Sequence, residues 1–137
     1  MISIKFSTIG LGTLLAAGAL LAADKDVKVD LSKLPPALTR SGVTYAKDLR
    51  PLFEKSCFKC HGPERQKGKL RLDSLAALLK GGEDGKVVEP GKSAQSVLVQ
   101  NVARLNPDDA MPPDGKGEPL TKEQIGLIRA WIDQGAK

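Results

Sequence analysis

The chain has 137 residues, of which 41% are hydrophobic and only 4% aromatic, and its formal net charge is +5. This length suits one small domain, and the acids interspersed among its basic residues argue against a nucleic-acid-binding protein. A domain with so few large side chains would gain much from a bulky apolar cofactor at its centre.

The N-terminal segment, residues 1–23, has the pattern of a secretory signal peptide. A single lysine, Lys5, precedes an apolar run over residues 6–23 that ends in small residues. The alternative is a retained transmembrane anchor, which requires about 20 apolar residues, usually stronger ones than the Gly, Ser and Thr of this run. The sequence therefore predicts a periplasmic protein cleaved after Ala22 or Ala23, which would meet the membrane only if the segment is retained.

The remainder of the chain divides into an arm and a domain. Residues 24–43 mix charged residues with Pro35-Pro36 and show no period, which predicts an extended N-terminal arm. The predicted domain follows as residues 44–137.

Near-helical spacing of apolar residues predicts a helix at the start of this domain. The residues concerned are Tyr45, Leu49, Leu52, Phe53 and Cys57. Pro51 leaves two arrangements open, a helix that begins with the proline in its first turn or a longer helix with a kink.

Two short helices are expected in the middle of the chain. Asp73 is placed to cap a helix over Ser74–Lys80, which Gly81-Gly82 would stop. Ser93 is placed to cap a second helix that continues to about Arg104. The apolar face of this second helix would be formed by Val97, Leu98, Val102 and Leu105.

The C-terminal helix has the clearest local signals. Thr121 and Gln124 fit a capping box, and Leu120 with Ile125 would form a hydrophobic staple. Gly135 is placed to end the helix, whose apolar face would consist of Ile125, Ile128, Trp131 and Ile132. No segment alternates well enough to form a sheet, so the sequence predicts an all-α fold with long loops.

The stretch SCFKCHG, residues 56–62, contains both cysteines of the chain and its only histidine. A structural zinc site usually needs four nitrogen or sulfur ligands, and this cluster exhausts the supply. A redox dithiol would be expected beside a βαβ pattern, which is missing, and a disulfide over so short a loop would stabilise little. The spacing C-x-x-C-H is typical of covalent haem attachment, with thioethers at Cys57 and Cys60 and His61 as the proximal iron ligand.

A second axial ligand follows by elimination. Apart from the initiator, Met111 is the only methionine, and the chain has no second histidine. A lone methionine often fills a core, but Met111 lies in the Pro-, Gly- and Asp-rich segment 106–119, which predicts a loop. The sequence therefore predicts axial ligation by Met111, while a lysine, a water molecule or an open site remain alternatives.

At this point the sequence resembles the class I c-type cytochromes, and more narrowly the cytochrome c domain found in planctomycetes and verrucomicrobia. The resemblance extends over residues 44–136. It is carried, in order, by CxxCHGP (57–63), KGxLRLDS (67–74), PGKxxxS (90–96), MPP (111–113) and WIDxGA (131–136).

The resemblance implies a class I fold, with a helix near the N-terminus crossing the C-terminal helix and long loops around one covalently bound haem. Leu49, Phe53 and Trp131 would form the contact between these helices. A backbone carbonyl near Pro90 would accept the Nδ1–H of His61 and fix the orientation of the imidazole.

The expected function is that of a monohaem c-type cytochrome, a monomer that carries single electrons between protein redox partners. Because Met111 and His61 would fill both axial positions, no catalytic residue is expected and the protein is not expected to be an enzyme. Alternatives are the electron-accepting haem subunit of an exported dehydrogenase complex, or an open-site haem sensor or enzyme. Lysines near the site suggest an acidic docking partner, although they could simply solvate the surface: Lys55, Lys59, Lys67 and Lys69.

Overall fold

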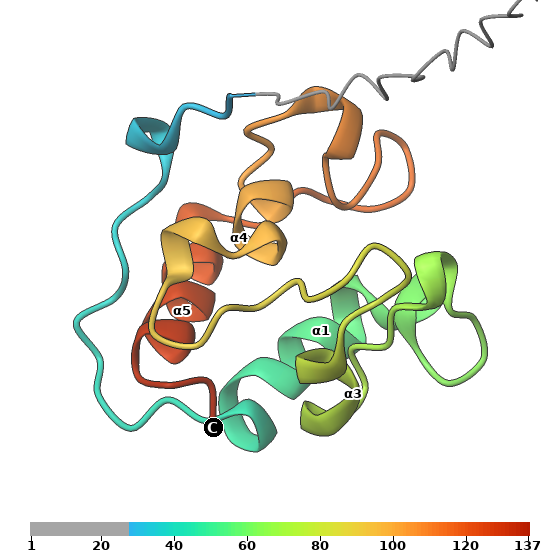
Figure 1. Ribbon diagram of the computed structural model, residues 1–137, viewed down its shortest axis with the longest axis horizontal. Helices are drawn as coiled ribbons and strands as arrows, with labels where there is room; N and C mark the ends of the chain where they lie inside the picture. Colours follow the sequence, from blue (N-terminus) through green and yellow to red (C-terminus); the bar gives the residue numbers. More distant parts are fainter. Residues whose placement is uncertain (1–27) are drawn as a thin grey trace, which may run out of the picture.

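The computed structural model describes residues 28–137 as short helices joined by long loops, with no β-strand in that part of the chain (Figure 1). The predicted all-α fold is confirmed for these residues. The predicted signal peptide, residues 1–23, lies outside the described residues, as does the start of the arm. The α-helices are α1 (Arg50–Ser56), α2 (Phe58–His61), α3 (Leu75–Lys80), α4 (Val97–Val102) and α5 (Lys122–Asp133). The other helical turns are the π-helical η2 (Tyr45–Leu49) and the 3-10 turns η1 (Leu31–Lys33), η3 (Lys67–Lys69), η4 (Ser93–Gln95) and η5 (Pro107–Asp109).

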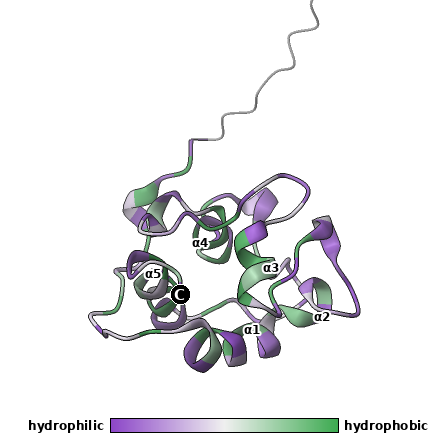
Figure 2. Cartoon of the chain, turned by 60° about the horizontal axis from the view of Figure 1, so that its bottom comes forward, coloured by the Kyte–Doolittle hydropathy of each residue, from purple (hydrophilic) through white to green (hydrophobic). Residues whose placement is uncertain are grey.

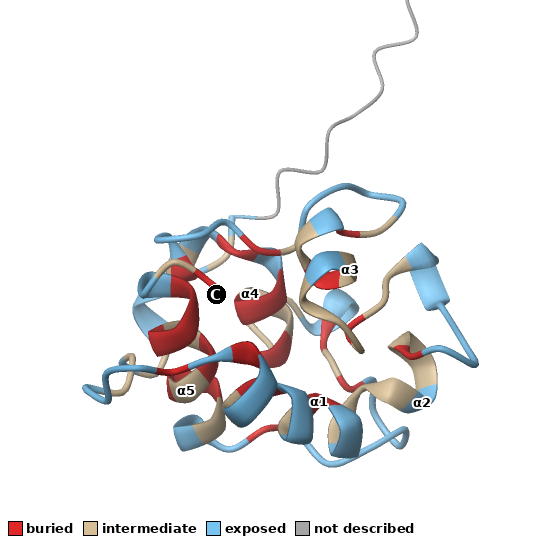
Figure 3. Ribbon diagram, turned by 90° about the horizontal axis from the view of Figure 1, so that it is seen from below, coloured by how far each residue is buried: buried red, intermediate tan, exposed pale blue. Residues whose placement is uncertain are grey.

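The helices form two groups that face each other. Helices α4 and α5 lie together on one side, and α1, α2 and α3 lie on the other (Figures 1 and 3). Hydrophobic residues concentrate on α3 and α4, whereas the outlying loops are largely hydrophilic (Figure 2). None of the helices within residues 28–137 has the length and apolar character needed to span a bilayer.

Pro51 lies in the first turn of α1, which settles the two arrangements that the sequence left open. The α-helix begins at Arg50, where the missing N–H of a proline costs no intrahelical bond. The π-helical turn η2 precedes it directly and is capped by Thr44, whose hydroxyl accepts the Lys47 N–H. The α-helix therefore begins with the proline in its first turn, directly after a helical turn of another type.

The predicted cap of α3 is wrong by one residue. Ser74 caps the helix by accepting the Ala77 N–H at 3.2 Å, whereas Asp73 forms two hydrogen bonds with the Arg71 guanidinium, at 2.9 and 2.6 Å. Gly81 ends the helix as predicted, with φ at +85°.

The predicted helix from Ser93 is also shorter than expected. Ser93 begins the 3-10 turn η4, and its N–H and hydroxyl both donate to Asp133 on α5 at 2.9 Å. Helix α4 starts only at Val97, which is 44% exposed, so Val97 does not belong to the apolar face. Val99 is buried there instead, beside Leu98 and Val102.

Helix α5 has the ends that the sequence predicted. The Thr121 hydroxyl accepts the Gln124 N–H, and the Gln124 side chain accepts the Thr121 N–H, which completes the capping box. Gly135 follows the helix with φ at +100°, and its N–H and that of Ala136 donate to Ile132 and Trp131 in a Schellman motif.

The described part of the arm lies against α5. The Leu38 N–H donates to the carbonyl of Gly126 at 3.0 Å, and the Gln134 side chain donates to the carbonyl of Arg40 at 2.8 Å. A Cβ atom at Gly126 would lie only 2.8 Å from the carbonyl oxygen of Pro36, so the glycine allows this close approach. The division at residue 44 stays a prediction.

The first helical region meets α5 through the side chain of Tyr45. Its ring lies 6.4 Å from that of Phe53 and 6.3 Å from that of Trp131, and both pairs are tilted. Leu49, Phe53 and Trp131 are fully buried in the same hydrophobic cluster. Burial raises the pKa of Tyr45, whose hydroxyl donates to the carbonyl of Leu72 at 2.7 Å.

Replacing Tyr45 with phenylalanine is expected to lower the free energy of unfolding by about 1–2 kcal/mol, because the Leu72 carbonyl loses a buried donor while the ring packing is kept. Chemical denaturation of both proteins measures the difference in unfolding free energy, provided that this energy falls with denaturant concentration at the same rate in both. Equal stability would mean that the Leu72 carbonyl finds another donor or water.

Candidate functional site

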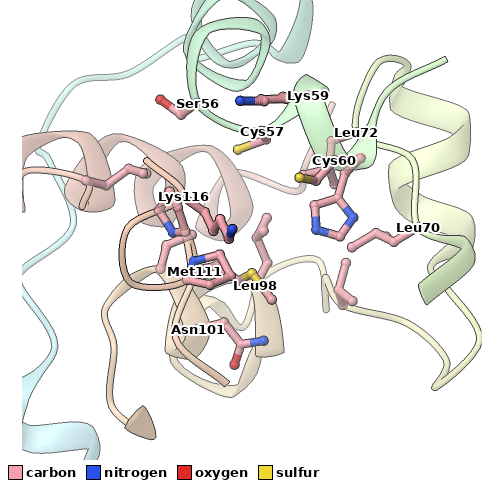
Figure 4. Close-up of a pocket in the computed structure, with 16 residues that line it drawn as sticks. Ser56, Cys57, Lys59, Cys60, Leu70, Leu72, Leu98, Asn101, Met111 and Lys116 are labelled. Carbon is pink, nitrogen blue, oxygen red and sulfur yellow. The ribbon is translucent and has the colours of Figure 1, made fainter. Parts of the chain in front are cut away.

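A cleft with about 100 Å³ of interior space opens between the cysteine segment and the methionine loop. Figure 4 shows Cys57 and Cys60 on one side of the cleft, with Met111, Leu98 and Lys116 across from them. Much of the lining is apolar, and includes Leu70, Leu72, Val87, Leu98, Val102 and Leu120. His61 lines the same cleft, so the structure brings all four predicted site residues together.

The turn between α1 and α2 places the two thiols and the imidazole close together. Cys57 lies between the two helices, and its carbonyl accepts the N–H groups of Cys60 at 3.1 Å and His61 at 2.9 Å. The carbonyl of His61 in turn accepts the Leu72 N–H at 2.8 Å. This short helical segment is therefore held by its own backbone bonds and by the loop that contains Leu72.

Both cysteines are free thiols in the structure. Burial, and secondarily the neighbouring Cys60, raise the pKa of Cys57 to about 12. Reactive redox cysteines have lowered pKa values in electropositive surroundings, so the environment of Cys57 argues against a dithiol oxidoreductase. A partly buried neutral thiol facing an apolar cleft fits a residue that forms a thioether to a bound group.

His61 presents a neutral ring to the cleft. Burial lowers its pKa, while the backbone carbonyls of Leu70 and Lys67 act in the opposite direction. Its Nδ1 atom is buried and has no hydrogen-bond partner within residues 28–137. The acceptor expected near Pro90 is therefore not present, and that prediction is wrong. An unpaired buried polar atom costs about 1–3 kcal/mol, so Nδ1 lacks the acceptor that would fix the imidazole orientation.

Met111 lies in the loop that forms the facing wall. Its N–H donates to the carbonyl of Asn101 in α4 at 3.0 Å, which ties the loop to that helix. The side chain is partly buried and packs against the hydrophobic cluster. The donor set around the cleft is therefore two thiols, one imidazole and one thioether, which are the groups used by haem c.

A protein-only zinc site has no support in the described residues. Within residues 28–137, no three His, Cys, Asp or Glu side chains lie close enough together to hold a metal ion. The alternative of a structural zinc at the cysteine segment therefore lacks its remaining ligands.

The apolar cleft continues into a wider and more polar one of about 570 Å³, which shares Cys60, His61 and Met111. Of the four lysines expected near the site, Lys59 and Lys67 line it. Sequence reasoning missed its other charged residues, which are Arg65, Glu83, Asp84, Asp108, Asp109 and Lys116. Lys116 could have been predicted to lie near Met111, because residues 113–116 read PDGK, a sequence typical of a turn. In the structure the Lys116 N–H donates to the Pro113 carbonyl and closes this turn.

Residues 28–137 are helical and gather a C-x-x-C-H segment and a methionine around one apolar cleft, which are features of a c-type cytochrome. Residues 57–115 match the family model described as planctomycete cytochrome C. This match supports a cytochrome c domain of that type, the family that the sequence resembles. No curated protein and no solved structure matches the chain.

Proposed function

We propose that the protein is an exported, periplasmic monohaem c-type cytochrome that carries single electrons between protein redox partners. Cys57 and Cys60 would hold haem c covalently, and His61 and Met111 would be its axial ligands. The observation that carries the proposal is the convergence of these four side chains on one apolar cleft. The family match supports haem binding and electron transfer as the general role.

The bound haem would supply the one-electron Fe(II)/Fe(III) couple. Around it, the chain provides two neutral ligands, the imidazole of His61 and the thioether of Met111. Leu70, Leu72 and Leu98 line the same cleft and would exclude water from the iron. Neutral ligands and an apolar lining both disfavour the more highly charged oxidised state, so a comparatively high reduction potential is expected.

The two axial side chains would leave no open position for a substrate, which favours an electron carrier over an enzyme. The wider part of the cleft would serve as the place of encounter with a partner. Its lining balances four basic residues, Lys59, Arg65, Lys67 and Lys116, against four acidic ones, Glu83, Asp84, Asp108 and Asp109. An acidic docking surface on the partner, with an association that slows in added salt, is therefore supported by the net charge of the chain, +5, rather than by this lining.

Absorption spectra of the oxidised and reduced protein, matured in a periplasm with haem-attachment machinery, test the proposal. Sharp reduced α and β bands, covalent haem c after denaturation in pyridine, and the weak far-red sulfur–iron(III) band are expected. Haem c without the far-red band, together with rapid carbon monoxide binding by the reduced protein, would favour an open distal site. A protein that leaves such a periplasm without haem would contradict the cytochrome proposal.

A further inference from the structure

The loop that carries Met111 is anchored to the end of α4 by the side chain of Arg104. The Nη1 atom donates to the carbonyl of Pro112 at 2.7 Å, and Nη2 pairs with the carboxylate of Asp114. The N–H of Met111 is held separately by the carbonyl of Asn101 at 3.0 Å. Met111 is therefore fixed from both sides, through its own amide and through the residues that follow it.

Arg104 occupies a position where glycine is the usual residue. It follows α4 in a Schellman motif, in which the N–H groups of Arg104 and Leu105 donate to Asn101 and Gln100 at 3.0 and 3.1 Å. Its φ is +56°, in the left-handed region that residues with a Cβ atom disfavour. Helix α5 ends in the same motif with Gly135 at this position.

The backbone at position 104 thus favours glycine, whereas the contacts of the loop require a long cationic side chain. The Arg104 side chain is 28% exposed, while Asp114 is 92% exposed, so the more protected contact is the one to the Pro112 carbonyl. A charged donor to a backbone carbonyl is stronger than a neutral one, and the guanidinium can hold two acceptors in a fixed orientation. Strain of this kind is common where a conformation serves function.

We propose that Arg104 is a positioning residue for Met111, and that it holds the methionine loop so that the thioether stays directed into the cleft. This inference rests on the proposed ligation of haem iron by Met111. Without the anchor, the segment 111–116 would keep its tie to Asn101 but lose the contacts beyond Met111. The sulfur would then leave the iron more often, and an added ligand would compete with it more successfully.

The test is Arg104→Gly in the full, haem-loaded protein. Glycine suits the left-handed turn, so the fold is expected to be kept while the anchor is removed. We expect a weaker far-red band, a lower reduction potential and an affinity for added imidazole that rises about tenfold. Faster amide hydrogen exchange over residues 111–116 is a second readout that does not depend on ligation.

Lys69→Gly is the matched control, since it also replaces a cationic residue of left-handed conformation, φ +54°, by glycine. Lys69 is exposed, and its side chain forms no ion pair within residues 28–137. This control is expected to leave the far-red band and imidazole affinity unchanged. Arg104→Lys keeps the charge, but an ammonium group does not hold two acceptors in a fixed orientation as a guanidinium does. We therefore expect its far-red band and imidazole affinity to lie between those of the wild type and of Arg104→Gly.

Two results would overturn the positioning role while leaving the ligation by Met111 intact. One is that Arg104→Gly leaves the far-red band and the imidazole affinity unchanged. The other is that Lys69→Gly changes them as much as Arg104→Gly does. A wild-type protein that lacks the far-red band would instead refute the ligation itself, and the positioning role with it. The wild-type spectrum therefore distinguishes failure of the inference from failure of the proposed function.

Discussion

Replacing both Cys57 and Cys60 with serine is expected to abolish covalent retention of haem, because a hydroxyl group does not form the thioether bond. Each single variant should retain one bond. In pyridine, the α band of a single variant should then lie between those of haem c and of non-covalent haem, since one vinyl group stays unsaturated. Acidified organic solvent extracts haem that is not covalently bound, and a haem stain of the denatured protein then measures the fraction of haem that stays attached.

Two further variants separate loss of the bond from damage to the cleft. Ser56→Ala changes the residue just before the motif, which lines the same cleft, and is expected to keep its haem. Cys57→Ala removes the sulfur without placing a hydroxyl group against the hydrophobic cluster that Cys57 contacts, so it should yield more folded protein than Cys57→Ser. Full covalent retention in both single serine variants, with normal spectra, would contradict two thioethers.

The parts of the fold that the sequence predicted well are those determined by neighbours along the chain. Helix α5 is the clearest example, because the capping box of Thr121 and Gln124 and the turn at Gly135 each involve residues only a few positions apart. Pro51 left two arrangements open, and the structure decides between them, because the π-helical turn before α1 has no sequence signal of its own.

The errors occurred where a polar side chain has a partner other than the nearest helix end. Ser93 was expected to cap a helix, but its hydroxyl bonds to Asp133, forty positions away. Asp73 was expected to cap α3, but the Arg71 guanidinium competes for its carboxylate through two hydrogen bonds. A serine or aspartate before an apolar segment identifies a possible cap, and the tertiary partners decide whether it is used.

The candidate site was predictable because its groups are rare in this chain. Two cysteines, one histidine and one methionine beyond the initiator left few combinations, and the structure places all four on one cleft. The surrounding residues were not predictable in the same way. Arg104 lies in a left-handed turn after α4 when it contacts the methionine loop, and an arginine gives no local signal of such a turn.

Replacing Met111 with alanine is expected to remove the far-red band and to lower the reduction potential by on the order of 0.1 V or more, given the wide span that axial ligands set. The imidazole of His61 would remain on one side of the iron, and the facing position would open to water or added ligands. We expect the reduced variant to bind carbon monoxide rapidly, whereas the wild type should bind it slowly. Potentiometric titration and carbon monoxide mixing measure the two effects.

Met111→Leu is the control that separates ligation from packing. Leucine keeps most of the apolar volume that Met111 adds to the hydrophobic cluster, so a core-filling role predicts nearly wild-type behaviour. A ligand role predicts loss of the far-red band in both variants, because neither side chain offers a sulfur atom. If the wild type lacked the band and Met111→Leu left the potential unchanged, the sixth ligand would have to be sought among other residues of the cleft. Lys116 would be the first to test, since its side chain lines both parts of the cleft.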